Sequence, residues 1–132
     1  MERFKLNKEA VQRWIGAVES DFDLNPGDLM GTRRYREIVD VRHLCYYLMR
    51  KHNMTTVYIG KLFNKDHSSI IHGSEKVAEY LLPFNQLPDA KINRLDNYLG
   101  FLVKQQRTQA FLERTQAIKE RTQALKELYA KA

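Results

Sequence analysis

The sequence predicts an all-α protein, a helix-turn-helix bundle with an additional long helix at its C-terminus. Apolar residues recur at helical spacing along most of the chain. Near the middle, the polar segment 65–69 leads directly into an apolar stripe, as at the start of a helix. Toward the end, a four-residue motif repeats every seven positions. With 132 residues, of which 43% are hydrophobic, the chain is long enough for one compact core and an appendage.

Four elements are expected before the helix-turn-helix. A helix is predicted from about residue 8 to residue 21, and Asn25 before Pro26 is a strong signal for the start of a single-turn helix. A basic loop at residues 31–34 precedes a long helix over about residues 39–51. The apolar positions that predict the two longer helices are Ala10, Val11, Trp14, Ile15 and Val18, then Val41, Leu44, Cys45, Leu48 and Met49.

The helix-turn-helix is predicted from a short helix over residues 55–63, capped by Thr55, and a second helix from Asp66 to about Leu82. Asp66 is expected to cap the second helix, because its carboxylate can accept the free N–H groups of the first turn. Side chains at the tip of such a helix reach base edges in the major groove of DNA. The tip consists of Asp66, His67, Ser68 and Ser69, and the buried stripe behind it of Ile70, Ile71, Ser74, Val77, Ala78 and Leu81.

These residues carry a resemblance to a known family. Part of this sequence resembles the signature of the C-terminal DNA-binding domain of the bacterial replication initiator DnaA. The matching residues are Ile59-Gly60 with Phe63, the segment 66–70, and Lys76-Val77. The resemblance covers roughly residues 8–82 and includes the opening helix, the basic loop and the long helix. It implies the all-helical fold of that domain and sequence-specific recognition of double-stranded DNA of the replication-origin type.

The resemblance also assigns roles to individual positions. It implies that Arg34 enters the minor groove and that Arg42 and His43 contact the DNA backbone and base edges, while the tip of the second helix reads the major groove. The charge fits a polyanionic partner, because the chain carries a net charge of +6 and basic residues outnumber acidic ones between residues 33 and 67. The predicted DNA-binding residues are Arg33, Arg34, Arg36, Arg42, His43, Lys61, Lys65, Asp66, His67, Ser68 and Ser69.

Three departures from the family pattern concern the DNA site. Asp40-Val41 stands where members commonly have Arg-Pro, which exchanges a positive for a negative charge and is expected to loosen the start of the long helix. The turn Asn64-Lys65 is one residue shorter than in many members. Ser68 and Ser69 replace two threonines and lack the methyl group that packs on a thymine methyl. We therefore expect a relaxed or changed base preference.

The function expected from the sequence is DNA binding without catalysis. The 132 residues leave no room for the nucleotide-binding module of a full initiator, and the chain has no Gly-x-x-x-x-Gly-Lys-Ser/Thr motif. We expect no enzyme activity, no nucleotide, no other cofactor, and a role in regulating the initiation of DNA replication. The alternatives are a protein-interaction module and a transcription regulator of a phage or mobile element that uses the same fold.

Two chemical alternatives fail on geometry. Asp66-His67-Ser68 contains the residue types of a hydrolytic triad, but successive residues on a helix point about 100° apart and cannot converge on one substrate atom. His67 and His72 are five residues apart, whereas zinc-binding histidines on a helix favour a spacing of four. No metal site is expected, and His72 is expected to be partly buried beside Ile71.

The C-terminal third is predicted to be a separate helical part. The proline-containing segment 83–90 predicts a linker between a domain over residues 1–82 and a long helix over residues 91–132. Residues 91–105 are expected to begin this helix and to dock on the globular domain.

The seven-residue repeat in this helix favours a weak coiled coil, and with it a homo-oligomer. A solvated helix, a frayed tail, or a helix folded back on the domain through Leu112 and Leu128 fits the pattern as well. The seam of the repeat alternates Phe111, Ile118 and Leu125 with Thr108, Thr115, Thr122 and Tyr129.

The cysteine content and hydropathy indicate a cytoplasmic protein. Cys45 is the only cysteine, so it has no partner for an intramolecular disulfide, and it is expected in the core. No apolar run approaches the roughly 20 residues that a membrane span requires, and residues 1–8 lack the apolar segment of a signal peptide. We expect no membrane partner.

Overall fold

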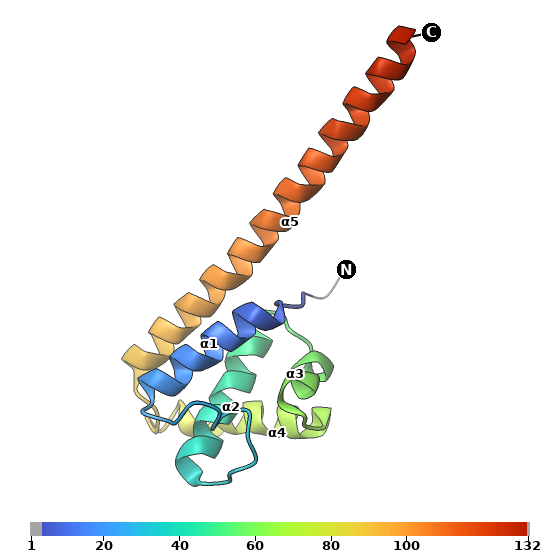
Figure 1. Ribbon diagram of the computed structural model, residues 1–132. Helices are drawn as coiled ribbons and strands as arrows, with labels where there is room; N and C mark the ends of the chain where they lie inside the picture. Colours follow the sequence, from blue (N-terminus) through green and yellow to red (C-terminus); the bar gives the residue numbers. More distant parts are fainter. Residues whose placement is uncertain (1–3, 132) are drawn as a thin grey trace.

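The computed structural model describes residues 4–131, which form helices and turns and contain no β-strand. The compact body and the long last helix that leaves it are seen in Figure 1. The predicted all-α class, with an additional long C-terminal helix, is confirmed. The elements are α1 (Lys8–Asp21), α2 (Arg36–Lys51), α3 (Thr56–Phe63), α4 (His67–Lys76), a π-helical segment η1 (Val77–Leu81) and α5 (Asp89–Lys131).

One hydrophobic core joins all the helices. Trp14, Leu44 and Leu99 are fully buried in it and come from α1, α2 and α5. Cys45 is also buried there, as expected. The predicted linker at residues 83–90 therefore separates helices that share a core, because the buried residues of α5 are Ile92, Leu95, Leu99, Leu102 and Val103.

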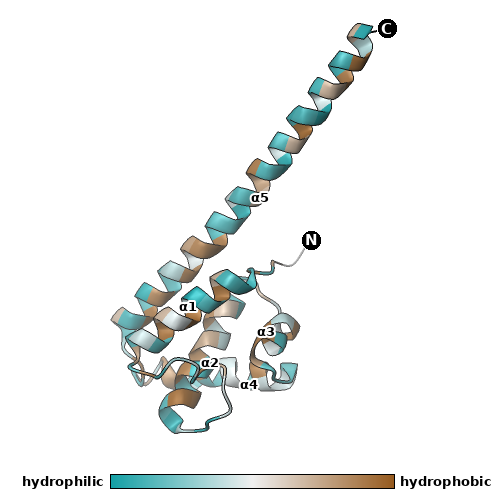
Figure 2. Ribbon diagram, in the orientation of Figure 1, coloured by the Kyte–Doolittle hydropathy of each residue, from teal (hydrophilic) through white to brown (hydrophobic). Residues whose placement is uncertain are grey.

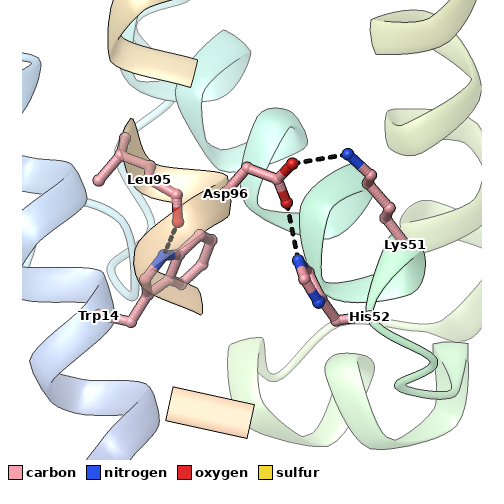
Figure 3. A network of polar contacts seen from close by, with 5 residues as sticks. All are labelled: Trp14, Lys51, His52, Leu95 and Asp96. Atoms are coloured by element: carbon pink, nitrogen blue, oxygen red, sulfur yellow. Dashed lines mark hydrogen bonds and ion pairs between the residues drawn. The ribbon is translucent and has the colours of Figure 1, made fainter. Parts of the chain in front are cut away.

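Helix α5 docks on the body by polar contacts as well as apolar ones (Figure 3). The indole Nε1 of Trp14 donates a hydrogen bond of 2.9 Å to the carbonyl of Leu95. Asp96 accepts one from Lys51 Nζ at 2.6 Å and lies 2.7 Å from His52 Nε2. These contacts fix α5 against both the first helix and the end of α2.

Helix α1 and the first part of α5 lie side by side in opposite directions (Figure 1). At one end, Arg94 pairs with Asp21 at 3.0 Å. At the other, Gln106 accepts from the backbone N–H of Asn7 at 2.7 Å and donates to the carbonyl of Lys5 at 2.8 Å. Beyond this point α5 projects from the body, and hydrophobic residues recur at intervals along a hydrophilic helix (Figure 2).

The structure corrects two predicted boundaries. The expected single-turn helix after Asn25 is a hydrogen-bonded turn over residues 26–30, in which Gly27 has a left-handed φ of 91° that a helix cannot accommodate. Helix α2 begins at Arg36 and not near residue 39, so Asp40 does not prevent the helix from starting early. The carbonyl of Tyr35 accepts from the N–H groups of residues 38 and 39 and so closes the first turn.

Candidate nucleic-acid interface

The turn of the helix-turn-helix depends on two residues with special backbone requirements. Thr55 caps α3 as predicted, since its hydroxyl accepts from the N–H of Tyr58 at 3.0 Å. Asn64 ends α3 in the left-handed conformation, with φ 53°. A Cβ on Gly60 would lie 2.5 Å from the carbonyl oxygen of Lys65. Glycine at this position therefore lets the chain after the turn pass directly against α3.

The tip of α4 is exposed as expected, but its cap differs from the prediction. Asp66 occupies the N-cap position and its side chain makes no capping hydrogen bond. Its carboxylate lies instead 3.1 Å from Nδ1 of His67, and both side chains are more than half exposed. Only the backbone carbonyl of Asp66 closes the turn, by accepting from Ser69 at 3.0 Å. The imidazole of His67 thus competes with the backbone N–H groups of the first turn for the carboxylate of Asp66. Ser68 and Ser69 are exposed beside it.

The opposite face of α4 packs tightly on α2. A Cβ on Gly73 would lie 2.6 Å from the imidazole carbon Cδ2 of His43, so only glycine allows this approach. At the next residue, the buried hydroxyl of Ser74 accepts from Arg50 at 2.6 Å and donates to the carbonyl of Ile70 at 2.9 Å. These contacts hold the exposed tip at a fixed orientation relative to the body.

His43 lies under α4 and is not an exposed base-contacting side chain. Its ring is partly buried, is 5.7 Å from the ring of Tyr46, and its Nδ1 is buried with no hydrogen-bond partner among the described residues. Burial, and then the nearby charge of Lys76, lowers the pKa of His43 below its usual value. A neutral imidazole at this position avoids burying a charge between the two helices.

The basic loop is exposed, but the arginine that follows it is not. Arg33, Arg34 and Arg36 are exposed, whereas Arg42 is only 4% exposed. The Nε of Arg42 donates to the carbonyl of Leu29 at 2.8 Å. Its Nη2 lies within hydrogen-bond distance of three further carbonyls, those of Asp28 at 3.0 Å, Gly31 at 3.2 Å and Arg33 at 3.1 Å.

This geometry corrects the expected role of Arg42. A guanidinium carries several donors in a fixed planar arrangement, and here it collects the carbonyls of the turn and the loop. It is therefore placed to set the course of the loop, and its burial leaves it unable to reach a DNA phosphate directly.

A bridge of three charged residues connects the start of α2 to the end of α4. Asp40 pairs with Lys76 at 3.3 Å and with Arg36 at 3.7 Å. The negative charge that departs from the family pattern is thus balanced by two neighbouring cations. The bridge thus links the start of α2, which follows the exposed loop, to the end of α4 that lies opposite its tip.

The remaining predicted residues lie around the tip. Lys61 is exposed on α3, and Lys65 is half-buried in the turn. The prediction that His72 is partly buried is wrong, because its side chain is exposed. Its spacing of four residues from Ser68 and three from Ser69 places it on the same face of α4, one turn from the tip. That spacing is the signal by which His72 could have been recognised as part of the surface.

Comparison with known proteins agrees with this geometry. The family described as "Bacterial dnaA protein helix-turn-helix" matches residues 11–77, which is the stretch from α1 through α4. The chain belongs to this DnaA helix-turn-helix family. The chain is similar to the chromosomal replication initiator protein DnaA of Thermomicrobium roseum, to which it is 38% identical over 87 residues, 64% of this chain and 18% of the relative. The DnaA of Latilactobacillus sakei is 31% identical to this chain over 96 residues, which are 68% of this chain and 21% of the relative.

The DnaA match thus spans about a fifth of the length of these initiators. It contains the turn built by Gly60 and Asn64, the exposed tip and the basic loop. Within residues 4–131, no helix is both long and apolar enough to cross a membrane.

Proposed function

We propose that the chain recognises double-stranded DNA in a sequence-specific manner, without catalysis, through the exposed tip of α4 and the basic loop before α2. The observation that carries this proposal is the rigid support of two exposed polar surfaces, the tip of α4 and the basic loop. The tip is held through Gly73 and Ser74, and the loop through Arg42. Preorganised side chains lose less conformational entropy when they bind, which favours specific recognition.

The tip of α4 would read the major groove. His67, Ser68 and Ser69 are exposed at the N-terminal end of the helix, where a helix-turn-helix presents its base-reading residues. Their short side chains combine donors and acceptors. His72 extends the same face by one turn, and we add it to the proposed contact residues.

The loop would supply the second contact, in the minor groove. Arg34 is exposed at the end of a loop whose backbone is fixed by Arg42, and a narrow minor groove attracts such an arginine electrostatically. Arg33, Arg36, Lys61 and Lys65 would add contacts to phosphates. Such contacts position the protein without reading sequence.

The named relatives support a proposal for the biological role. They are chromosomal replication initiators, and this chain matches the part of them that holds the helix-turn-helix. We propose that the chain binds origin-type sites and regulates initiation at them, without ATP hydrolysis by the matched segment.

A binding assay with matched variants tests the proposal. The best site is first selected from a random duplex library, and affinity is then measured for the wild type, Arg34→Ala and Arg114→Ala. The last variant removes the same charge from the exposed, projecting part of α5. We expect Arg34→Ala to lose at least about tenfold in affinity, which corresponds to roughly 1.4 kcal/mol, and Arg114→Ala to bind like the wild type.

The salt dependence provides a second readout. With about four to six phosphate contacts, the slope of log affinity on log salt is expected to be roughly −4 to −5. Equal losses in the two variants, or selection of no preferred sequence, would contradict specific recognition by the loop and the tip.

A further inference from the structure

The last part of α5 presents an apolar seam without a partner in this structure. We define the projecting segment as residues 108–131, which leave the body after the contacts of Gln106 and after the guanidinium of Arg107, which lies over the ring of Phe4 at 4.7 Å (Figure 1). At about 1.5 Å per residue, it extends roughly 36 Å from the body. The large apolar side chains of its seam are 48–64% exposed, and Tyr129 at its end is 79% exposed. The seam consists of Thr108, Phe111, Thr115, Ile118, Thr122, Leu125 and Tyr129.

The period of the seam indicates what kind of surface it fits. Its residues alternate by three and four positions, as the a and d positions of a coiled coil do. An ideal helix drifts by about 20° per heptad relative to such a repeat, so a strict repeat of seven stays in register only with a supercoiled partner helix. A flat lipid surface would instead favour the period of 3.6. The period favours a helix as occupant of the seam.

Two of the three threonines of the seam, Thr115 and Thr122, can be buried at little cost. The hydroxyl of Thr115 donates to the carbonyl of Phe111, and that of Thr122 to the carbonyl of Ile118, both at 2.9 Å. Each hydroxyl thus has a partner within its own helix, so covering it leaves no unsatisfied polar group. The threonine methyl groups then supply apolar contact at the a positions.

Four of the six positions that flank the seam in the projecting segment are basic, and the other two are Leu112 and Leu128. The basic positions determine the class of partner. Flanking positions in a coiled coil set partner choice through interhelical charge pairs. The glutamates lie on the far side of the helix, where Glu113, Glu120 and Glu127 accept from glutamines four residues earlier. Among the described residues, no ion pair of 4 Å or less involves the flanking cations. Those cations are Arg114 and Arg121 at g positions and Lys119 and Lys126 at e positions.

A second copy of this chain is a poor partner for these flanks. A parallel pair brings g positions opposite e positions, which would place Arg114 near Lys119 of the other copy. An antiparallel pair brings g opposite g and e opposite e, which again places like charges together. Both arrangements cost free energy through repulsion.

We propose that the projecting segment is a docking site for an acidic helix of another protein, one with an apolar heptad seam and glutamate or aspartate at its e and g positions. The pair forms a heteromeric coiled coil in which the acidic flanks of the partner meet Arg114, Arg121, Lys119 and Lys126. This inference is independent of the proposed DNA-binding function.

Two synthetic peptides test the proposal against the full chain. Both have about four heptads with isoleucine and leucine at a and d. The probe has glutamate at every e and g position, and the matched control has lysine there. Fluorescence anisotropy of the labelled peptides measures affinity. We expect the glutamate peptide to bind at least about tenfold more tightly than the lysine peptide, because four basic side chains each contribute to the preference.

Two variants separate the contributions of charge and seam. In the double variant Arg114→Glu with Arg121→Glu, the preference should shift toward the lysine peptide. Ile118→Gln should weaken binding of the glutamate peptide, while circular dichroism shows the fold retained, since Ile118 is 64% exposed.

Four outcomes would overturn the proposal. One is a stable dimer of the chain alone in sedimentation experiments at micromolar concentration. Another is binding to phosphatidylglycerol vesicles without binding to the glutamate peptide. Equal affinity for the two peptides, or binding of neither, would also exclude an acidic helix as the occupant.

Discussion

Arg42 Nε donates to the carbonyl oxygen of Leu29 over 2.8 Å, which ties the start of α2 to the turn before the basic loop. Its Nη2 is within hydrogen-bond distance of the carbonyl of Arg33 on the loop itself, at 3.1 Å. The buried guanidinium of Arg42 thus donates hydrogen bonds to carbonyls that have no partner within a helix. The loop that carries Arg34 has its shape because of this residue.

We predict that Arg42→Ala lowers the free energy of unfolding by about 2 kcal/mol, since several carbonyls lose a charged donor. Arg42→Lys should restore little of this lost free energy of unfolding, because one ammonium group cannot reach the same set of carbonyls. Urea unfolding monitored by circular dichroism measures both variants. Arg33→Ala, at an exposed position, is the control and should unfold like the wild type. If Arg42→Ala were as stable as that control, the positioning role would be wrong.

The second prediction concerns the base pairs beneath Arg34. A narrow A·T-rich minor groove has an enhanced negative potential, so replacing those pairs with G·C should weaken binding by the wild type. In Arg34→Ala, the loss of affinity caused by the G·C pairs should nearly disappear, because the side chain that lies in the groove has been removed. Affinity for paired duplexes that differ only at these positions measures the effect. An equal penalty in both proteins would assign Arg34 to the phosphates.

The third prediction is a decrease in stability at mildly acidic pH that depends on His43. Burial, and then Lys76, lowers the pKa of His43 in the folded protein below the usual 6.5. As the pH falls below 6.5, the unfolded chain takes up a proton that the folded chain resists, so stability decreases toward the lowered pKa. Urea unfolding of wild type and His43→Gln between pH 5 and pH 7.5 should show a smaller slope in the variant. His72→Gln, at an exposed position, should retain the wild-type slope.

The fourth prediction concerns the docking of α5. Burial acts to raise the pKa of Asp96, but hydrogen bonds from Lys51 and His52 outweigh it, and the pKa lies below the ordinary 3.8. The stabilisation by the ionised Asp96 is therefore present above about pH 4 and is lost as the pH falls through the lowered pKa of this residue. Asp96→Asn should cost about 1 kcal/mol at pH 7, a modest figure because Lys51 is half exposed.

Acid unfolding checks the assignment to Asp96. Below pH 4, the stability of Asp96→Asn should decline less steeply than that of the wild type. Asp23→Asn is the matched control, since Asp23 is exposed and asparagine tolerates its positive φ of 56°. A pH profile of Asp96→Asn that matches both the wild type and this control would show that the Asp96 contacts do not stabilise the docked helix.

Local signals in the sequence account for most of the helices and for the turn. The apolar spacing around Trp14 and Leu44 marks α1 and α2, and Thr55 marks the start of α3, because these features act within a few residues. The family signature, built on Gly60 and the tip at residues 66–69, is local for the same reason. The departure at Asp40 is visible in the sequence, but its neutralisation by Lys76 is not, since the two residues meet only when α4 packs on α2.

The sequence by itself determined the all-helical class, the helix-turn-helix and the exposed tip of α4. Only the tertiary structure decided that Arg42 is buried, that His43 lies beneath Gly73, and that Trp14 donates to the carbonyl of Leu95. Periodicity and capping depend on neighbours along the chain, so they can be read from the order of residues. Exposure and hydrogen-bond partners of a polar side chain depend on segments that are distant in sequence. A basic residue beside an exposed loop therefore has one role when it faces solvent and another when packing encloses it.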